Sequence, residues 1–165
     1  MLADAILDSL ARLDCDGLAV HLVSGAAAGG MPSADAAGRQ YELQVLTDVR
    51  DMAQHMAWAD GAVSACGSTV WELAFMGLPA VLIVVADNQV PIAAQLQEYG
   101  VFPEVLTLDE AMDGSALPAA VRRLVADTPG RRGVGEAGRA LVDGCGPARV
   151  VGHLMSSGAR STERQ

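Results

Sequence analysis

Residues 61–85 read GAVSACGSTVWELAFMGLPAVLIVV and predict a strand, a helix and a second strand. We expect the first strand over residues 61–65, the helix over residues 69–76, closed by Gly77, and the second strand over residues 79–85. The second strand is apolar throughout, which is typical of a parallel strand covered on both faces. This unit is therefore expected at the centre of an α/β fold.

The same alternation continues on both sides of this unit. Further strands are expected at residues 18–23, 41–46 and 105–108, with a Gly/Ala-rich loop over residues 25–38. Helices are expected at residues 2–13, 49–58 (capped by Asp48), 91–99, 118–126, 131–142 and 147–155. The pattern predicts one Rossmann-like domain, residues 1–155, with a parallel sheet, helices on both faces and a disordered tail over residues 156–165.

Composition excludes several classes of function. The chain has 20 acidic residues against 11 basic ones, all of them arginine, so a net charge of −9 would repel a nucleic acid backbone. We find no apolar run long enough to cross a bilayer and no signal sequence, which predicts a cytoplasmic protein. The three cysteines have no paired spacing, and neither a metal site nor a cofactor is expected.

The turn between the central strand and helix carries the candidate site. Gly67, Ser68 and Thr69 lead from a strand end into a helix start, where free backbone N–H groups and the helix dipole favour an anion such as a diphosphate. Glu72 lies one turn further and could accept hydrogen bonds from a ribose diol. Ligands of such sheets bind at the carboxyl ends of the strands, where this turn is expected.

The same residues have a second interpretation. Thr69-x-x-Glu72 is also the pattern of a capping box, and taken alone the segment fits that interpretation better. Cys66 is expected to pack as a small buried side chain. His55 is expected to form an exposed pair with Asp51, one turn away, and His21 to lie within the sheet.

A longer string of motifs changes the balance. WAD at 58–60, CGST at 66–69 with Glu72, MGLPA at 76–80 and ADNQ at 86–89 follow one another at close spacing. This string resembles the C-terminal, UDP-sugar-binding half of the GT-B glycosyltransferases that include the peptidoglycan N-acetylglucosaminyltransferase. The ADNQ segment is more similar to a related family, the UDP-sugar hydrolases of the pseudaminic acid pathway, which cleave UDP from a diacetamido-trideoxy sugar.

The resemblance implies particular roles for these residues. Glu72 would bind the ribose hydroxyls, and the turn formed by residues 67–69 would bind the diphosphate. Asn88 and Gln89 would contact the sugar or its phosphate, and the backbone around Val49 would pair with the uracil edge. The implied function is UDP-sugar hydrolysis; a glycosyltransferase donor-binding half, a non-catalytic binding module and a domain for another phosphate ligand such as flavin mononucleotide remain alternatives.

The chain also departs from these families. It begins at a helix, without the strand and glycine loop that precede it in relatives, and it has no acceptor-side half, so no catalytic residue is assigned. The missing strand belongs between the strands at residues 18–23 and 61–65. We therefore expect either direct pairing of those two strands or a gap with unsatisfied backbone groups, which a partner chain or a second copy would complete if the chain is not truncated.

Overall fold

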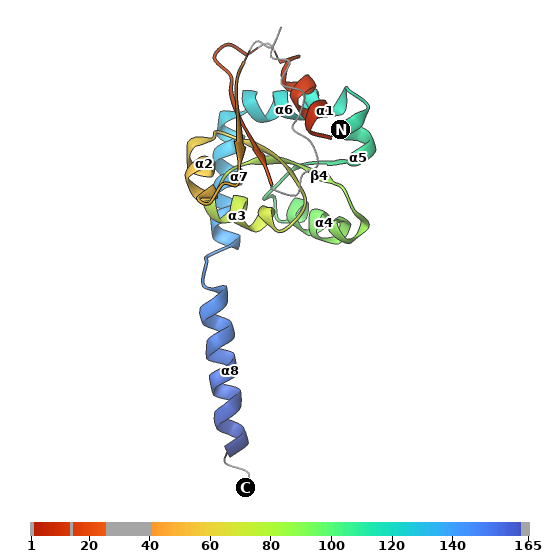
Figure 1. Ribbon diagram of the computed structural model, residues 1–165. Coiled ribbons are helices and arrows are strands. Elements are labelled where there is room, and N and C mark those ends of the chain that lie inside the picture. The colour runs from red at the N-terminus through yellow and green to blue at the C-terminus, as the bar shows by residue number, and fades with distance from the viewer. Residues whose placement is uncertain (1, 14, 26–40, 163–165) are drawn as a thin grey trace.

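The computed structural model describes residues 2–13, 15–25 and 41–162 and has a Rossmann-like α/β architecture, as the sequence predicts (Figure 1). All its strand pairs are parallel, and helices flank them. Most of the loop expected over residues 25–38 lies outside the described residues. In the part of the chain that is described, no helix is both long and apolar enough to cross a membrane.

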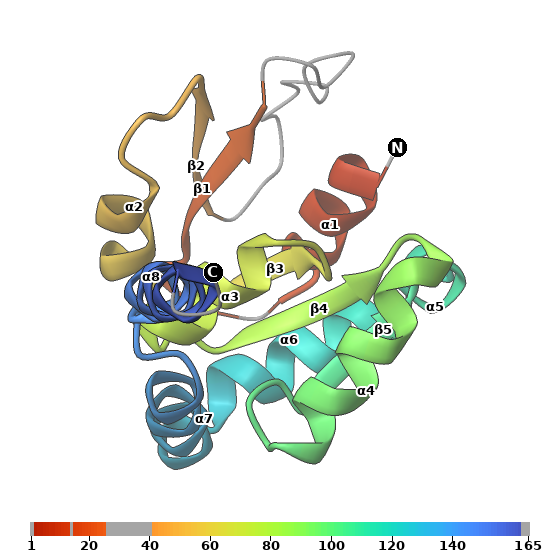
Figure 2. The ribbon, with the colours of Figure 1, turned by 90° about the horizontal axis from the view of Figure 1, so that it is seen from below.

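The strands form two sheets instead of one. In the first, β1 (Ala19–Ser24) pairs with β2 (Glu42–Thr47); in the second, β4 (Ala80–Val84) lies between β3 (Ala62–Ala65) and β5 (Glu104–Thr107). Figure 2 shows the β1–β2 pair standing apart from β3, β4 and β5. The direct pairing of β1 with β3 is therefore not formed, and the break falls where the sequence predicted a missing strand.

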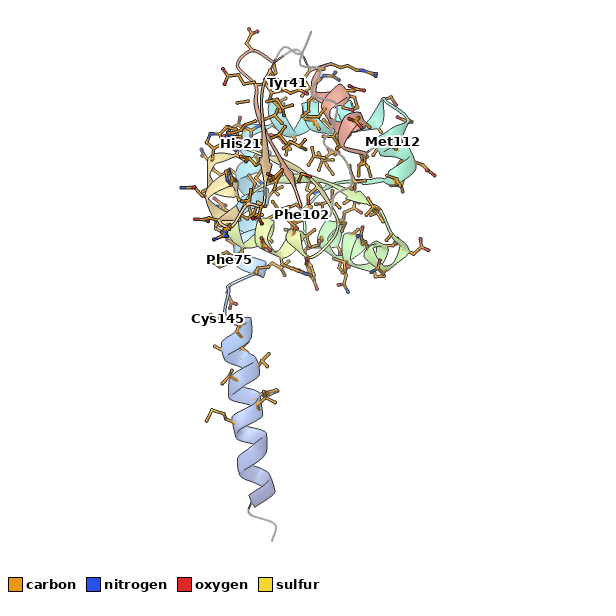
Figure 3. The ribbon with its side chains drawn as sticks, in the orientation of Figure 1. His21, Tyr41, Phe75, Phe102, Met112 and Cys145 are labelled. Carbon is orange, nitrogen blue, oxygen red and sulfur yellow. The ribbon has the colours of Figure 1, made fainter. Side chains whose placement is uncertain are left out.

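Strand β4 forms the centre of the hydrophobic core. Leu82 packs on one side with Leu73, Leu96 and Phe102, which Figure 3 labels. This group is shared by helices α2 (Met52–Trp58), α3 (Thr69–Met76) and α4 (Val90–Glu98). Val81 and Ile83 pack on the other side, against α1 (Leu2–Leu10), α5 (Leu108–Met112) and α6 (Ala116–Ala126). Because successive side chains of a strand point to opposite faces, this alternation gives two cores from one apolar run.

The helices follow the predicted order with some different boundaries. They are α1 (Leu2–Leu10), α2 (Met52–Trp58), α3 (Thr69–Met76), α4 (Val90–Glu98), α5 (Leu108–Met112), α6 (Ala116–Ala126), α7 (Thr128–Leu141) and α8 (Gly146–Thr162). The short α5, of five residues, and a single 3-10 turn of three residues, η1 (Asp87–Gln89), were not predicted, because elements this short leave no periodic pattern in the sequence.

Two boundaries differ for clear reasons. Helix α2 starts at Met52 and not at residue 49, because Asp51 accepts the hydrogen bond from the backbone N–H of Gln54 at 3.2 Å, whereas Asp48 has a left-handed backbone with φ of 52°. Helix α8 continues past Met155 to Thr162 and projects away from the body of the molecule (Figure 1). The division into a domain and a disordered tail stays a prediction.

Helices α3 and α7 approach each other unusually closely. A Cβ atom on Gly138 of α7 would lie 2.8 Å from the Ala74 carbonyl oxygen of α3, and one on Gly135 would lie 2.5 Å from the Gly77 carbonyl oxygen. Gly77 ends α3 with φ of 65°, a conformation that glycine adopts without strain. The contact therefore depends on glycine on both sides.

This contact predicts opposite effects for two glycines of α7. Gly138→Ala should lower the free energy of unfolding by about 1–3 kcal/mol, because the new methyl group overlaps α3 backbone. Gly133→Ala, where a Cβ atom meets open space, should raise it by about 0.5–1 kcal/mol through helix propensity. Urea denaturation measures both, and a Gly138→Ala protein as stable as the unmodified chain would contradict the packing described.

Candidate functional site

The loops that follow β3 and β4 lie together at the carboxyl ends of these neighbouring strands. The Cys66 backbone N–H donates to the Ile83 carbonyl at 2.8 Å, and the Cys66 sulfur lies 4.0 Å from the Gln89 carbonyl oxygen. Because β3 and β4 are parallel and in register, both loops emerge at the same edge. The structure thus brings residues 67–69 close to residues 87–89.

Helix α3 does not have the capping box that its sequence permits. Ser68 occupies the N-cap position with helical dihedral angles (φ −60°, ψ −25°) and makes no side-chain cap, and Thr69 is already the first helical residue. Within the described residues, no hydrogen bond involves the Ser68 or Thr69 hydroxyl or the Glu72 carboxylate. The capping interpretation is therefore wrong, and these polar groups remain available.

The same four-residue pattern forms a complete capping box elsewhere in the chain. Thr107 precedes α5 with an extended backbone, its hydroxyl accepts the Glu110 N–H at 3.2 Å, and the Glu110 carboxylate accepts the Thr107 N–H at 2.8 Å. These bonds to Thr107 lower the pKa of the Glu110 carboxyl. The two sites differ in the position of the threonine, which precedes α5 but lies inside α3.

The start of α3 is open for an anion. A Cβ atom on Gly67 would meet no atom within 4 Å, so the space above this turn is free. The backbone N–H groups of Ser68 and Thr69 donate to no carbonyl among the described residues. Unpaired N–H groups at the positive end of a helix, with two hydroxyl groups beside them, are suited to phosphate oxygens.

The second loop has a structural role that the sequence did not reveal. The side-chain oxygen of Gln89 accepts the Val85 backbone N–H at 2.9 Å, which closes the turn after β4. The NH₂ group of Gln89 is left as a donor, and Asn88 is exposed beside it. Both residues predicted for the sugar therefore lie near Gly67, at the carboxyl ends of the strands. Gln89 also stabilises its own loop, whereas Asn88 does not.

Val49 lies in the loop between β2, a strand of the other sheet, and α2. It follows Asp48, whose left-handed backbone turns the chain sharply between β2 and α2. Helix α2 packs on α3 through Met56, which is in the same buried core as Val70. The half-buried Val49 thus lies three residues before the helix that flanks the candidate site.

Cys66 is a packing residue. Its side chain is fully buried, and this burial raises the pKa of the thiol. A higher pKa means less of the thiolate at neutral pH, so Cys66 is a poor nucleophile despite its place before a helix.

The predicted Asp51–His55 pair is wrong. The Asp51 carboxylate caps α2, and His55 instead contacts His21 of β1, with 3.3 Å between their Nδ1 atoms. Asp51 was predicted as the partner because it lies one helical turn from His55. His21 was missed because a contact between two distant elements leaves no pattern in the sequence.

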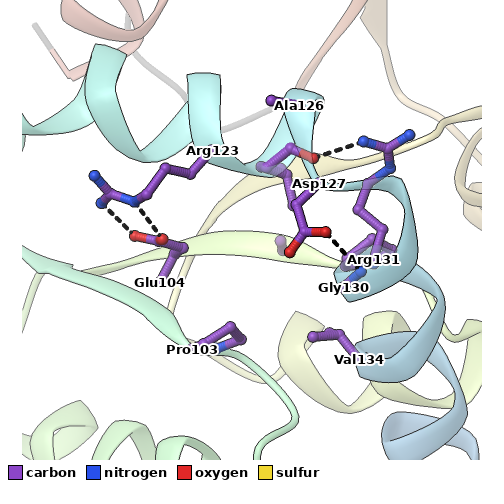
Figure 4. A pocket seen from close by; sticks show the side chains of 11 residues that line it. Pro103, Glu104, Arg123, Ala126, Asp127, Gly130, Arg131 and Val134 are labelled. Carbon is purple, nitrogen blue, oxygen red and sulfur yellow. Dashed lines mark hydrogen bonds and ion pairs between the residues drawn. The ribbon is translucent and has the colours of Figure 1, made fainter.

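A surface hollow lies at the opposite end of the second sheet, where β4 and β5 begin (Figure 4). Its charged side chains serve the fold: Arg123 pairs with Glu104 at 2.6 Å, the Asp127 carboxylate accepts the Gly130 N–H at 2.9 Å, and Arg131 donates to the Leu124 carbonyl at 2.7 Å. The hollow therefore offers no uncommitted charge for a ligand.

The fold and the loops after β3 and β4 together define a Rossmann-like α/β protein. The start of α3, at the carboxyl ends of its strands, is open. The chain is similar to the spore coat polysaccharide biosynthesis protein SpsG of Bacillus subtilis (strain 168), with 29% identity over 114 residues. The match covers 69% of this chain and 33% of that protein, so the chain corresponds to about a third of it. No protein-family model matches, and no solved structure matches.

The contrast between α3 and α5 predicts that their threonines differ in importance for stability. Thr107→Ala should lower the free energy of unfolding by about 0.5–2 kcal/mol, because it removes a formed cap. Thr69→Ala should change it by less than about 0.5 kcal/mol, because the Thr69 hydroxyl makes no bond. Thermal or urea unfolding compares them, and equal losses would show that α3 is capped after all.

Proposed function

We propose that this chain binds the UDP portion of a UDP-sugar at the start of α3 and belongs to an enzyme that processes nucleotide sugars. The observation that carries the proposal is the uncapped start of α3, with open space above Gly67 and unbonded Ser68 and Thr69 groups. Its neighbour, the Asp87–Gln89 turn, offers amide groups at the same edge. The similarity to a polysaccharide biosynthesis protein supports a substrate that carries sugar.

Each residue type suits one part of the ligand. The N–H and hydroxyl groups of Ser68 and Thr69 would donate to the diphosphate, above Gly67. The Glu72 carboxylate, exposed one turn along α3, would accept hydrogen bonds from two ribose hydroxyls. Asn88 and the NH₂ group of Gln89 would bind the sugar or its phosphate, and the backbone near Val49 would pair with uracil.

The reaction we propose is hydrolysis that releases UDP. The positive end of α3 would stabilise the charge that develops on the leaving diphosphate. A water molecule must also be positioned and deprotonated, and we assign that step to an acceptor-side domain, since this chain matches about a third of SpsG. A cytoplasmic location remains a prediction.

Transfer to a sugar hydroxyl is the second candidate, because SpsG, to which the chain is similar, is a polysaccharide biosynthesis protein. Hydrolase and transferase share the donor site and differ only in what attacks the sugar. The two are separated by measuring UDP release from UDP-sugars, with and without acceptor sugars, by this chain together with an acceptor-side domain. Release in water alone indicates a hydrolase, and release that depends on an acceptor indicates a transferase. No release under either condition indicates a non-catalytic binding module.

We expect UDP binding to be sensitive to two small substitutions. Gly67→Ala should weaken binding at least tenfold, because a methyl group would occupy the space assigned to phosphate while leaving the fold intact. Glu72→Ala should weaken it about tenfold, which corresponds to the loss of hydrogen bonds to a charged group worth about 1.5 kcal/mol. Isothermal titration calorimetry with UDP, UMP and uridine measures both effects.

The matched control is Glu98→Ala, an exposed glutamate at the far end of α4, which should bind UDP normally. Unfolding curves must show that Gly67→Ala and Glu72→Ala are folded. If the folded chain binds no UDP, or if Glu72→Ala binds as tightly as the unmodified chain, the proposed site is refuted.

We also propose that a further parallel strand, from another chain or a second copy, completes the sheet between β1 and β3. Val20 of β1 and Val63 of β3 pack against the same core, although their strands do not pair. Successive residues of a parallel strand direct their backbone groups to opposite sides of the strand. The N–H groups of Ala62 and Cys66, which are an even number of residues apart, both bond on the β4 side. The backbone of Val63 therefore faces the β1 side, where no strand of the described residues pairs with it.

Hydrogen exchange and light scattering test the added strand together. We expect the amides of Val63 and Val23 to exchange rapidly in a monomer of 17.0 kDa and slowly once a strand is bound. A larger mass with slow exchange would identify a second copy as the donor. A 17.0 kDa monomer in which both amides exchange slowly would contradict the proposal, because the edges would already be paired.

A further inference from the structure

Helix α8 has an apolar stripe that the described residues of its own chain do not cover. The stripe consists of four large side chains at the i, i+1, i+4 and i+5 positions of one helix face, which are between 55% and 74% exposed: Val150, Val151, Leu154 and Met155. The helix projects away from the body of the molecule (Figure 1). A helix of 17 residues with three glycines is marginal on its own in water, so α8 needs a surface to pack against.

The outer side of α3 is a second exposed apolar surface. Trp71 and Phe75, one helical turn apart, form an aromatic pair whose side chains are 43% and 50% exposed. A Cβ atom on Gly144 would lie 2.9 Å from the Phe75 ring, and Figure 3 labels Phe75 near Cys145, just before α8 begins. The aromatic pair is therefore at the end of the body from which α8 projects.

The stripe of α8 does not reach the aromatic pair of its own chain. Residues 142–145 direct the chain outward, with an extended backbone at Val142 and φ of 72° at Gly144. From Gly146 the helix rises about 1.5 Å per residue, which places Leu154 about 12 Å beyond the start of α8. A second copy has no such restriction and can bring the two surfaces together.

We propose that two copies of this chain form a two-fold dimer in which the α8 stripe of each copy packs on Trp71 and Phe75 of the other. A two-fold pair uses each surface twice and covers both. From their exposed fractions the six side chains present roughly 650 Å² per chain, so the pair buries about 1,300 Å², within the range of stable interfaces. This pairing does not depend on UDP.

Charge favours a second copy over a membrane surface as the partner of α8. Residues 146–162 contain two arginines and no acidic residue, whereas the whole chain has 20 acidic residues and a net charge of −9. Arg149 is already paired with Asp143. An acidic body is repelled by anionic lipid and attracts a helix that carries no acidic group.

Light scattering over a wide range of protein concentration is the direct experiment. We expect the unmodified chain to reach twice its monomer mass of 17.0 kDa. Leu154→Glu should weaken the dimer at least about tenfold, because it places a carboxylate within the buried stripe. The matched control is Ser156→Glu, which adds the same charge on the opposite side of α8 and should dimerise normally.

Tryptophan fluorescence tests the receiving surface on α3. In a Trp58→Phe background Trp71 is the remaining tryptophan, and its emission should shift to shorter wavelength as the chain dimerises and the ring leaves water. Leu154→Glu in the same background should remove this shift at the concentrations where the parent is a dimer. Trp71→Ser, which leaves α8 unchanged, should weaken the dimer as Leu154→Glu does.

Three results would each overturn the proposal. A mass of 17.0 kDa at every concentration would mean that a different partner covers α8. A dimer that Leu154→Glu leaves intact would be held by another surface, such as the edges of β1 and β3. A dimer that forms without a change in Trp71 emission would show that α8 packs elsewhere than on α3.

Discussion

The burial of β4 on both faces is the constraint on which the rest of the structure depends. Val81, Leu82 and Ile83 are completely buried and alternate between two groups of helices. A strand with no polar side chain can exist only where helices cover both faces and strands flank both edges. Because β3 and β4 are parallel, the loops of residues 67–69 and 87–89 then lie at the same end of the sheet, beyond the carboxyl ends of these strands. The candidate site is therefore a consequence of how this strand is covered.

The sequence predicted the core elements well because their signals are local and strong. An apolar run, a helix closed by Gly77 and alternation along the chain were enough to predict five strands and their parallel class. Short elements such as α5 were missed, and α2 was given the wrong cap, since Asp48 and Asp51 are equally suitable residues by type. Only the backbone of Asp48, turned into the left-handed region, distinguishes them.

The candidate site shows a sharper limit of sequence analysis. Thr69-x-x-Glu72 and Thr107-x-x-Glu110 have the same pattern, yet only the second forms a capping box. What differs is the backbone conformation of the residue before the helix, which is helical at Ser68 and extended at Thr107. The contact of His21 with His55 was likewise unpredictable, since 34 residues and two elements separate them. Bonds between distant elements depend on tertiary packing.

The close approach of α3 and α7 has a mechanical consequence. With Gly135 and Gly138 in direct contact with α3 backbone, no side chain separates the two helices, and they must move as one rigid body. Helix α8 is joined to α7 by residues 142–145, which are not helical and include the extended Val142 and Gly144 with φ of 72°, so α8 is not part of this rigid pair. A tilt of α3 at the candidate site would therefore be passed directly to α7.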